Sequence, residues 1–164
     1  MRFTLLDRIT SLEPGEKITA VKNLTMAEEY LADHFPHFPV MPGVLMLEAM
    51  IEAGAWLIRA TEDFEHSMVV LRKAGNVKYG QFVQPGQTLE VSAEILNQNN
   101  GETKIKARGT MHGRLTVAGR ITLYSYNLAD VHPTREDTDN DVRNEMRKLF
   151  ALLYDPNQVS EQAE

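Results

Sequence analysis

The sequence contains no cysteine, which excludes disulfide bonds, thiolate metal sites and a cysteine nucleophile. It has no apolar run of the roughly 18 to 20 residues that a membrane-spanning helix needs, and residues 1–10 lack the apolar stretch of a signal peptide. These absences predict a cytoplasmic protein in a reducing compartment, whose chemistry depends on groups other than thiols.

Positive charge is scarce relative to negative charge. The formal net charge is -6, and most of the acidic excess lies after residue 128, so the main body is nearly neutral. Nucleic acid is therefore not expected as the main partner. With 164 residues, 43% of them hydrophobic, the chain is long enough for one packed domain and too short for two of ordinary size.

Turn residues divide the main body into strands around one helix. An apolar, partly alternating run over residues 3–24 is interrupted by Glu13-Pro14-Gly15-Glu16, which predicts two strands joined by a turn. From Gly43, about 16 mainly apolar residues predict a helix buried on most sides. Period-two patterns and turn signals then predict an antiparallel meander with strands over residues 68–71, 76–83, 88–96, 103–112 and 114–126. The pattern indicates an α+β protein.

A second helix is predicted near the C-terminus. Residues 129–138 are polar and indicate a linker, and Asp139 and Asp141 suit the cap and first turn of a helix. Five apolar side chains then fall on one helical face, namely Val142, Met146, Leu149, Phe150 and Leu153. We expect this face to dock on its own protomer or a neighbouring subunit, with a separate partner as the alternative. The predicted division is a domain over residues 1–128, followed by a linker, helix and frayed tail over residues 129–164.

Glu48 is the residue that the apolar pattern explains least, because it lies inside the run LMLEAMI. Burying a carboxylate costs several kcal/mol unless it is paired, hydrogen-bonded or protonated. A protonated carboxyl in an apolar setting is what a general acid near neutral pH requires. The alternative is an exposed stripe shared with Glu52, one helical turn further on.

His34 is the first residue of the segment HFPHFPVMPG, whose three prolines exclude a regular helix and predict a stiff loop. This loop leads to the start of the Glu48 helix, so a base and an acid are carried by one short segment. Free amides around Gly43 and the positive end of the helix dipole can stabilise a developing negative charge there. From the pattern alone, His37 and Glu52 are candidates for the same roles, and a structural histidine is the alternative.

The segment HFPHFPVMPGVLMLEAM resembles the signature of the 3-hydroxyacyl-acyl carrier protein dehydratases of type II fatty acid synthesis, H-F-P-G-x-P-x-x-P-G-V-L-x-x-E-A. The resemblance extends over about residues 3 to 126. It implies a hot-dog fold, an antiparallel sheet wrapped around the central helix, with active sites at a dimer interface. The family spacing places His34, and not His37, opposite the carboxyl of Glu48.

The resemblance also implies the chemistry. His34 would remove the carbon 2 proton, Glu48 would protonate the departing hydroxyl, and the Gly43 amide would hold the thioester carbonyl. The acyl chain would enter an apolar tunnel near the helix and the strand with residues 82–83. Besides Gly43, the implied substrate-binding residues are Phe35, Val44, Phe82 and Val83.

No metal or redox cofactor is implied, because the phosphopantetheine arm arrives with the acyl carrier protein. The cations Arg72, Lys73 and Lys78 are candidates for contacts with this acidic partner, with a merely solvated face as the alternative. A homodimer is implied, and a trimer of dimers is left open.

Two positions depart from the family pattern. His37 replaces the usual glycine after H-F-P, and Glu52 replaces the glutamine that commonly follows the catalytic glutamate by four residues. A divergent member is therefore expected. An acyl-coenzyme A thioesterase or hydratase of the same fold, or an inactive lipid-binding or partner subunit, are the competing hypotheses.

Overall fold

The computed structural model describes residues 4–35 and 37–157. Within these residues, six strands form one antiparallel sheet in the order β1-β2-β4-β5-β6-β3. The strands are β1 (Arg8–Glu13), β2 (Lys17–Asn23), β3 (Met68–Tyr79), β4 (Thr88–Asn99), β5 (Glu102–Met111) and β6 (Arg114–Tyr126). The helices are α1 (Tyr30–Asp33), α2 (Gly43–Thr61) and α3 (Glu136–Leu153), with short 3-10 turns over Leu128–Asp130 and Pro133–Arg135. None of the described helices is long and apolar enough to cross a membrane.

Two tight turns set the register of the central hairpins. Asn100 and Gly101 join β4 to β5, and His112 and Gly113 join β5 to β6; all four residues have positive φ. Two-residue turns of this kind match the twist of antiparallel strands, and Asn-Gly is a sequence that favours them. The predicted turn between β1 and β2 is also present, with Gly15 at φ 82°.

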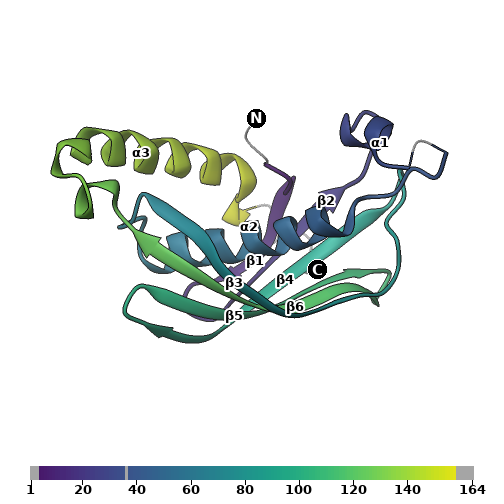
Figure 1. Cartoon of the computed structure of the whole chain (residues 1–164), viewed down its shortest axis with the longest axis horizontal. Coiled ribbons are helices and arrows are strands. Elements are labelled where there is room, and N and C mark those ends of the chain that lie inside the picture. The colour runs from purple at the N-terminus through teal and green to yellow at the C-terminus, as the bar shows by residue number, and fades with distance from the viewer. Residues whose placement is uncertain (1–3, 36, 158–164) are drawn as a thin grey trace.

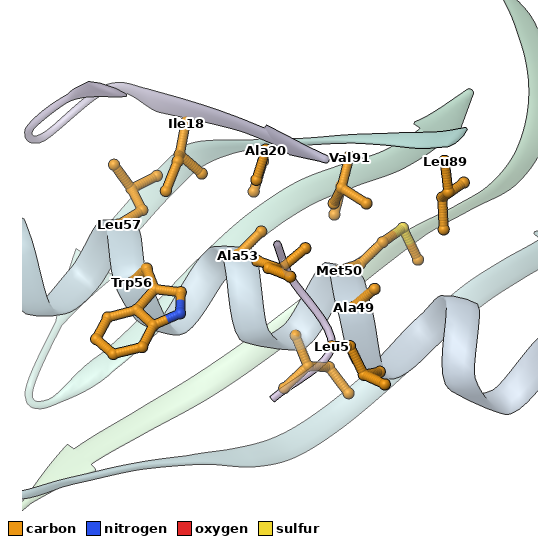
Figure 2. Packing of buried hydrophobic residues seen from close by; sticks show 14 of the residues in the cluster. Leu5, Ile18, Ala20, Ala49, Met50, Ala53, Trp56, Leu57, Leu89 and Val91 are labelled. Atoms are coloured by element: carbon orange, nitrogen blue, oxygen red, sulfur yellow. The ribbon is translucent and has the colours of Figure 1, made fainter. Parts of the chain in front are cut away.

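The core lies between α2 and the concave face of the sheet (Figure 1). Met50, Ala53 and Leu57 of α2 point toward strand residues such as Ile18 and Val91, and all are buried (Figure 2). Each large apolar side chain buried in this way contributes about 1.5–3 kcal/mol. The predicted central helix is confirmed, and so is the sheet wrapped around it.

Gly54 explains how α2 approaches the sheet so closely. A Cβ atom at this position would lie 2.3 Å from Cδ1 of Ile105 and 3.1 Å from Cδ1 of Leu123. Both of these side chains are fully buried. A glycine in the middle of a helix is unfavourable by itself, so its role here is to remove the atoms that would hold α2 away from β5 and β6.

The prediction for β3 was wrong in two respects. Residues 68–71 and 76–83 were predicted as separate strands, but β3 is one strand that ends at Tyr79, with register shifts between Leu71 and Lys73 and between Gly75 and Lys78. It also pairs with β6 at the sheet edge instead of continuing into β4. Consequently β4, β5 and β6 form the meander, while residues 80–87 cross back as a loop.

Helix α3 lies on the side of α2 that faces away from the sheet (Figure 1). The ring of Phe150 contacts Trp56 of α2 and Phe64 just after it, with ring centroids 5.9 and 5.4 Å apart. The predicted helix and its docking on the same protomer are confirmed. The predicted cap was wrong: α3 begins at Glu136, and Asp139 is buried inside its first turns. The predicted frayed tail falls mainly on residues 158–164, outside the described residues.

Candidate active site

Glu48 and Glu52 lie on the side of α2 that faces away from the sheet, and both are half-buried. The Glu52 carboxylate accepts hydrogen bonds from the amides of Leu5 at 2.8 Å and Leu6 at 3.2 Å, and Trp56 Nε1 donates to it at 3.4 Å. Glu52 therefore holds the N-terminal segment against α2. Among the described residues, none donates a hydrogen bond to Glu48, which leaves its carboxyl available to a ligand.

The Glu52 carboxyl is also electrostatically distinct. Burial raises its pKa, the hydrogen bonds from the Leu5 and Leu6 amides and Trp56 lower it, and the nearby Glu48 raises it again; the net change is upward. Of the two carboxyls that the sequence pattern left as candidates, Glu52 is thus committed to structure and Glu48 is not.

A cavity of about 480 Å³ lies beside Glu48, between α2, β3 and α3. Its size is typical of a small-molecule site, and most of its lining is apolar. The lining residues are Thr4, Glu48, Ile51, Glu52, Ala55, Trp56, Arg59, Met68, Val69, Met146 and Leu149. Glu48 was predicted from the sequence, whereas the contribution of β3 and α3 was not, because periodicity shows which face of an element is apolar and not which cavity that face borders.

His34 lies at the C-terminal end of α1, where its backbone amide donates to the carbonyl of Tyr30 at 3.0 Å. Its imidazole is half-buried and lies 4.4 Å, centroid to centroid, from the ring of Phe35. His34 is not among the residues that line the Glu48 cavity of its own chain. His37 lies in the same loop with an exposed side chain.

The loop after His34 is conformationally unusual. Phe35 has φ 51°, a left-handed conformation that is uncommon for residues other than glycine, and its ring is 60% exposed. The buried Val40 and Met41 then fix the chain, and the Met41 amide donates to the Val83 carbonyl at 2.9 Å. This bond joins the loop to the residues that follow β3.

Helix α2 begins at Gly43, after an N-cap proline that gives no side-chain cap. The first helical hydrogen bond is from the Leu45 amide to the Pro42 carbonyl at 2.9 Å, so the amides of Gly43 and Val44 have no acceptor within the helix and lie at the positive end of its dipole. A Cβ atom at Gly43 would lie 2.9 Å from the ring of the exposed Tyr79, so a larger residue there would force this ring to move. The next residue, Val44, has a side chain that is 69% exposed.

Phe82 and Val83 were predicted to lie in a strand, which was wrong, since both follow the end of β3. Val83 is fully buried, whereas Phe82 is 60% exposed and packs edge-on against Phe38 at 5.6 Å between centroids. Exposed aromatic rings thus gather near the loop that joins α1 to α2, where the described part of the chain leaves them uncovered.

The three candidate cations all lie on β3 with exposed side chains. Arg72 forms an ion pair with Glu102 at 2.8 Å and stacks over the Tyr124 ring. Lys73 and Lys78 pair with Thr122 and Ala118 of β6, four residues apart, which places them about 13 Å apart at 3.3 Å per residue. The three therefore form a row along one sheet edge, and Arg72 already has a partner.

Among residues 4–35 and 37–157, no three His, Asp or Glu side chains are grouped so that they could hold a metal ion. The expectation of a reaction without a metal or other cofactor stays a prediction.

Residues 1–122 match the family model described as a FabA-like domain. The chain belongs to the FabA-like family. It is 37% identical to the 3-hydroxyacyl-acyl-carrier-protein dehydratase FabZ of Ruminiclostridium cellulolyticum, over 73% of this chain and 84% of the relative. The FabZ enzyme of a Janthinobacterium species is 36% identical, over 79% of this chain and 85% of the relative. The FabA-like assignment confirms the predicted family and the predicted dehydratase activity toward 3-hydroxyacyl thioesters.

The fold of this FabA-like chain also agrees with a solved structure. The dehydratase heterocomplex ApeI:P from Xenorhabdus doucetiae superimposes with a TM-score of 0.64 at 16% identity, covering 81% of this chain and 90% of the other. At this identity the likeness concerns the fold alone, and it confirms the predicted hot-dog arrangement. The FabA-like match ends at residue 122, so α3 lies beyond it.

Proposed function

We propose that this chain dehydrates (3R)-3-hydroxyacyl chains on acyl carrier protein to trans-2-enoyl thioesters in fatty acid biosynthesis, with His34 and Glu48 as its acid-base pair. The observation that supports Glu48 most directly is its position: a half-buried carboxyl on α2 that borders an apolar cavity and receives no hydrogen bond from the described residues. The family membership supplies the reaction class.

In the proposed reaction, His34 Nε2 or Nδ1 takes a proton from carbon 2 while the amides at the start of α2 donate hydrogen bonds to the thioester oxygen, where negative charge develops. The bond between carbon 3 and its hydroxyl then breaks. Glu48 donates its proton to that hydroxyl, which leaves as water. Transfer of the proton from His34 back to Glu48 restores the starting state.

A homodimer completes the site in this proposal. His34 does not border the Glu48 cavity of its own chain, so a second protomer is needed to bring a histidine to that carboxyl. The edge strand β3 and the exposed Val44, Phe35 and Phe82 provide an apolar surface near the start of α2 for such contacts. A trimer of dimers and a cytoplasmic location stay predictions.

Acyl carrier protein is the proposed carrier, as in the names of the FabZ relatives. Lys73 and Lys78 are the exposed cations best placed to meet its acidic surface, because Arg72 is already paired with Glu102. Contacts between opposite charges steer the two proteins together and weaken as the salt concentration rises.

The decisive assay offers the protein a 3-hydroxyacyl thioester and a saturated acyl thioester, each on acyl carrier protein and on coenzyme A. Formation of the 2-enoyl product from the first substrate, without release of free thiol from the second, is the expected result. Thiol release from the saturated thioester would identify a thioesterase instead. Equal rates on both carriers would remove the assignment to acyl carrier protein.

A further inference from the structure

We propose that α3 forms a wall of the acyl-chain site and that Met146 and Leu149 determine which chain lengths fit. This inference rests on the proposed function, because it takes the occupant of the Glu48 cavity to be the acyl chain of the substrate. It concerns a helix that lies beyond residues 1–122, the part of the chain that the family model matches.

The cavity itself connects α3 to the proposed chemistry. Met146 and Leu149 line the same cavity of about 480 Å³ as Glu48. They lie three residues apart on α3, so they project from one helical face, and both are half-buried. The opposite walls are Ile51 and Ala55 of α2 and Val69 of β3. An extended hydrocarbon chain starting near Glu48 would therefore contact α2, β3 and α3 together.

Four residues of α3 hold the helix in a fixed position over the cavity. The buried Asp139 accepts hydrogen bonds from the Leu128 and Ala129 amides, each at 2.9 Å, and from the Ser67 hydroxyl. Arg143 donates to Asn127 at 3.0 Å. Further along the helix, Arg147 donates to the Asp63 carbonyl at 2.8 Å, and Phe150 packs on Trp56 and Phe64. Because α3 is anchored at these points, the cavity wall that it forms stays in place and can exclude an acyl chain that is too long.

The ends of the cavity limit the chain length. Glu48 and Arg59 both line it and lie eleven residues apart on α2, which corresponds to about 16 Å at 1.5 Å per residue. An extended chain advances about 3.5 Å for every three single bonds, so about 14 carbons span this distance. Arg59 donates hydrogen bonds to the carbonyls of His66 and Ser67, which places a charged group at the far end. A longer apolar chain would have to displace the Arg59 guanidinium or bend away from it.

The experiment compares Leu149→Ala, Leu149→Trp and Met146→Ala with matched changes at Leu152, which lies on the same helix but is 82% exposed. Binding of saturated acyl-pantetheines with 4, 8, 12 and 16 carbons is measured by calorimetry, and dehydration of the corresponding 3-hydroxyacyl substrates is measured in parallel. Leu149→Trp is expected to weaken binding of the 12-carbon chain at least tenfold and of the 4-carbon chain less than twofold. Leu149→Ala and Met146→Ala are expected to strengthen binding of the 16-carbon chain several-fold relative to binding of the 8-carbon chain.

The two measurements separate this inference from the proposed function. If the wild type binds the chains but dehydrates none of them, the proposed reaction fails while the role of α3 is still tested by binding. If dehydration is normal and the chain-length profile is the same in every Leu149 and Met146 variant as in Leu152→Ala and Leu152→Trp, the role of α3 in substrate choice is wrong. Leu149→Trp counts as folded only if its circular dichroism spectrum and melting temperature match those of the wild type; otherwise the two alanine variants decide.

Discussion

The Ser67 hydroxyl donates a hydrogen bond to the Asp139 carboxylate, and both side chains are buried. Ser67 immediately precedes β3, whereas Asp139 belongs to α3, so this bond ties the added helix to the start of the edge strand. The same carboxylate binds the Leu128 and Ala129 amides of the connecting turn. One side chain therefore fixes where the chain leaves the sheet and where α3 lies.

Asp139→Asn is expected to lower the free energy of unfolding by about 1–3 kcal/mol, because an amide cannot accept all three hydrogen bonds and one buried donor loses its partner. Urea denaturation measures this, with Asp137→Asn as the control, since Asp137 is an exposed acid in the same first turn. Burial raises the pKa of the Asp139 carboxyl, but the hydrogen bonds from Ser67 and the two amides, with Arg143 nearby, lower it overall.

The acid dependence of Asp139 follows from that lowered pKa. Its stabilising contribution is fully present above the ordinary aspartate pKa of about 3.9 and is lost as the pH falls through the lowered value. The stability difference between the wild type and Asp139→Asn should therefore narrow below about pH 4. A difference that stays constant down to pH 2.5 would show that the carboxylate charge contributes nothing.

Gly54→Ala is expected to destabilise the protein, although alanine is the better helix former by up to about 1 kcal/mol. The new methyl group would lie 2.3 Å from the buried Ile105 side chain, and overpacking of this kind costs about 1–3 kcal/mol. A net loss of about 1–2 kcal/mol should appear in urea denaturation. Gly75→Ala is the control, because its Cβ would come no nearer than 3.9 Å to another group. Equal stability of the two variants would contradict close packing of α2 on the sheet.

The sequence was most informative where local rules decide the structure. The turns at Gly15, Gly101 and Gly113 and the apolar run of α2 rest on residue conformation and periodicity, and both kinds of prediction are confirmed. The course of β3 was not predictable in this way. The sequence predicts a break between residues 71 and 76, but Gly75 and Asn76, the latter with φ 53°, form a bulge within one strand, because pairing with the distant β6 overrides the local signal.

In the candidate site, too, the sequence predicted what local patterns decide and not what distant packing decides. Glu48 could be singled out because a carboxylate inside an apolar helix needs an explanation, and the structure places it at a cavity. Met146 and Leu149 were recognised only as part of an apolar face, since periodicity does not specify the surface against which a helix packs. In the proposed function His34 meets Glu48 through a second protomer, an arrangement that the family resemblance implied and that residue periodicity alone could not predict.

Glu52→Gln is expected to change how stability depends on pH. The pKa of Glu52 is raised in the folded protein, so the folded state binds its proton more tightly than the unfolded state does. The contribution of this group is therefore most favourable below the ordinary glutamate pKa of about 4.3, and it is lost as the pH rises through the raised value. A glutamine can still accept from the Leu5 and Leu6 amides, as the carboxylate does.

The variant should thus gain stability relative to the wild type as the pH rises above the ordinary glutamate pKa of about 4.3. Urea denaturation at several pH values measures the difference in free energy of unfolding between the variant and the wild type. Glu62→Gln serves as the comparison, because Glu62 is also half-buried but caps the C-terminus of α2. A stability difference between Glu52→Gln and the wild type that does not widen as the pH rises would contradict the raised pKa of Glu52.

Single substitutions test the roles proposed for His34 and Glu48. His34→Ala and Glu48→Gln are each expected to lower kcat for dehydration about 10²- to 10⁴-fold, the usual contribution of a positioned acid or base. His37→Ala should leave kcat within a few-fold of the wild type, because its exposed imidazole is a neighbour in the loop and not the proposed base. Circular dichroism and melting temperature establish that the variants are folded. If His37 proved essential and His34 dispensable, the proposed assignment of the base would be wrong.

Mixed dimers test whether the pair works across a subunit interface. His34 does not border the Glu48 cavity of its own chain, so the proposal takes the histidine from one protomer and the glutamate from the other. In a dimer of one His34→Ala chain and one Glu48→Gln chain, one site would then combine the two intact side chains and the second site would lack both. Co-expressed chains that pair at random form such mixed dimers half of the time, so about a quarter of the wild-type activity should return. Purification with two different affinity tags should raise this to about half. If both catalytic groups came from the same chain, every site in the mixed dimer would lack one of them, and activity would stay at the level of the single variants.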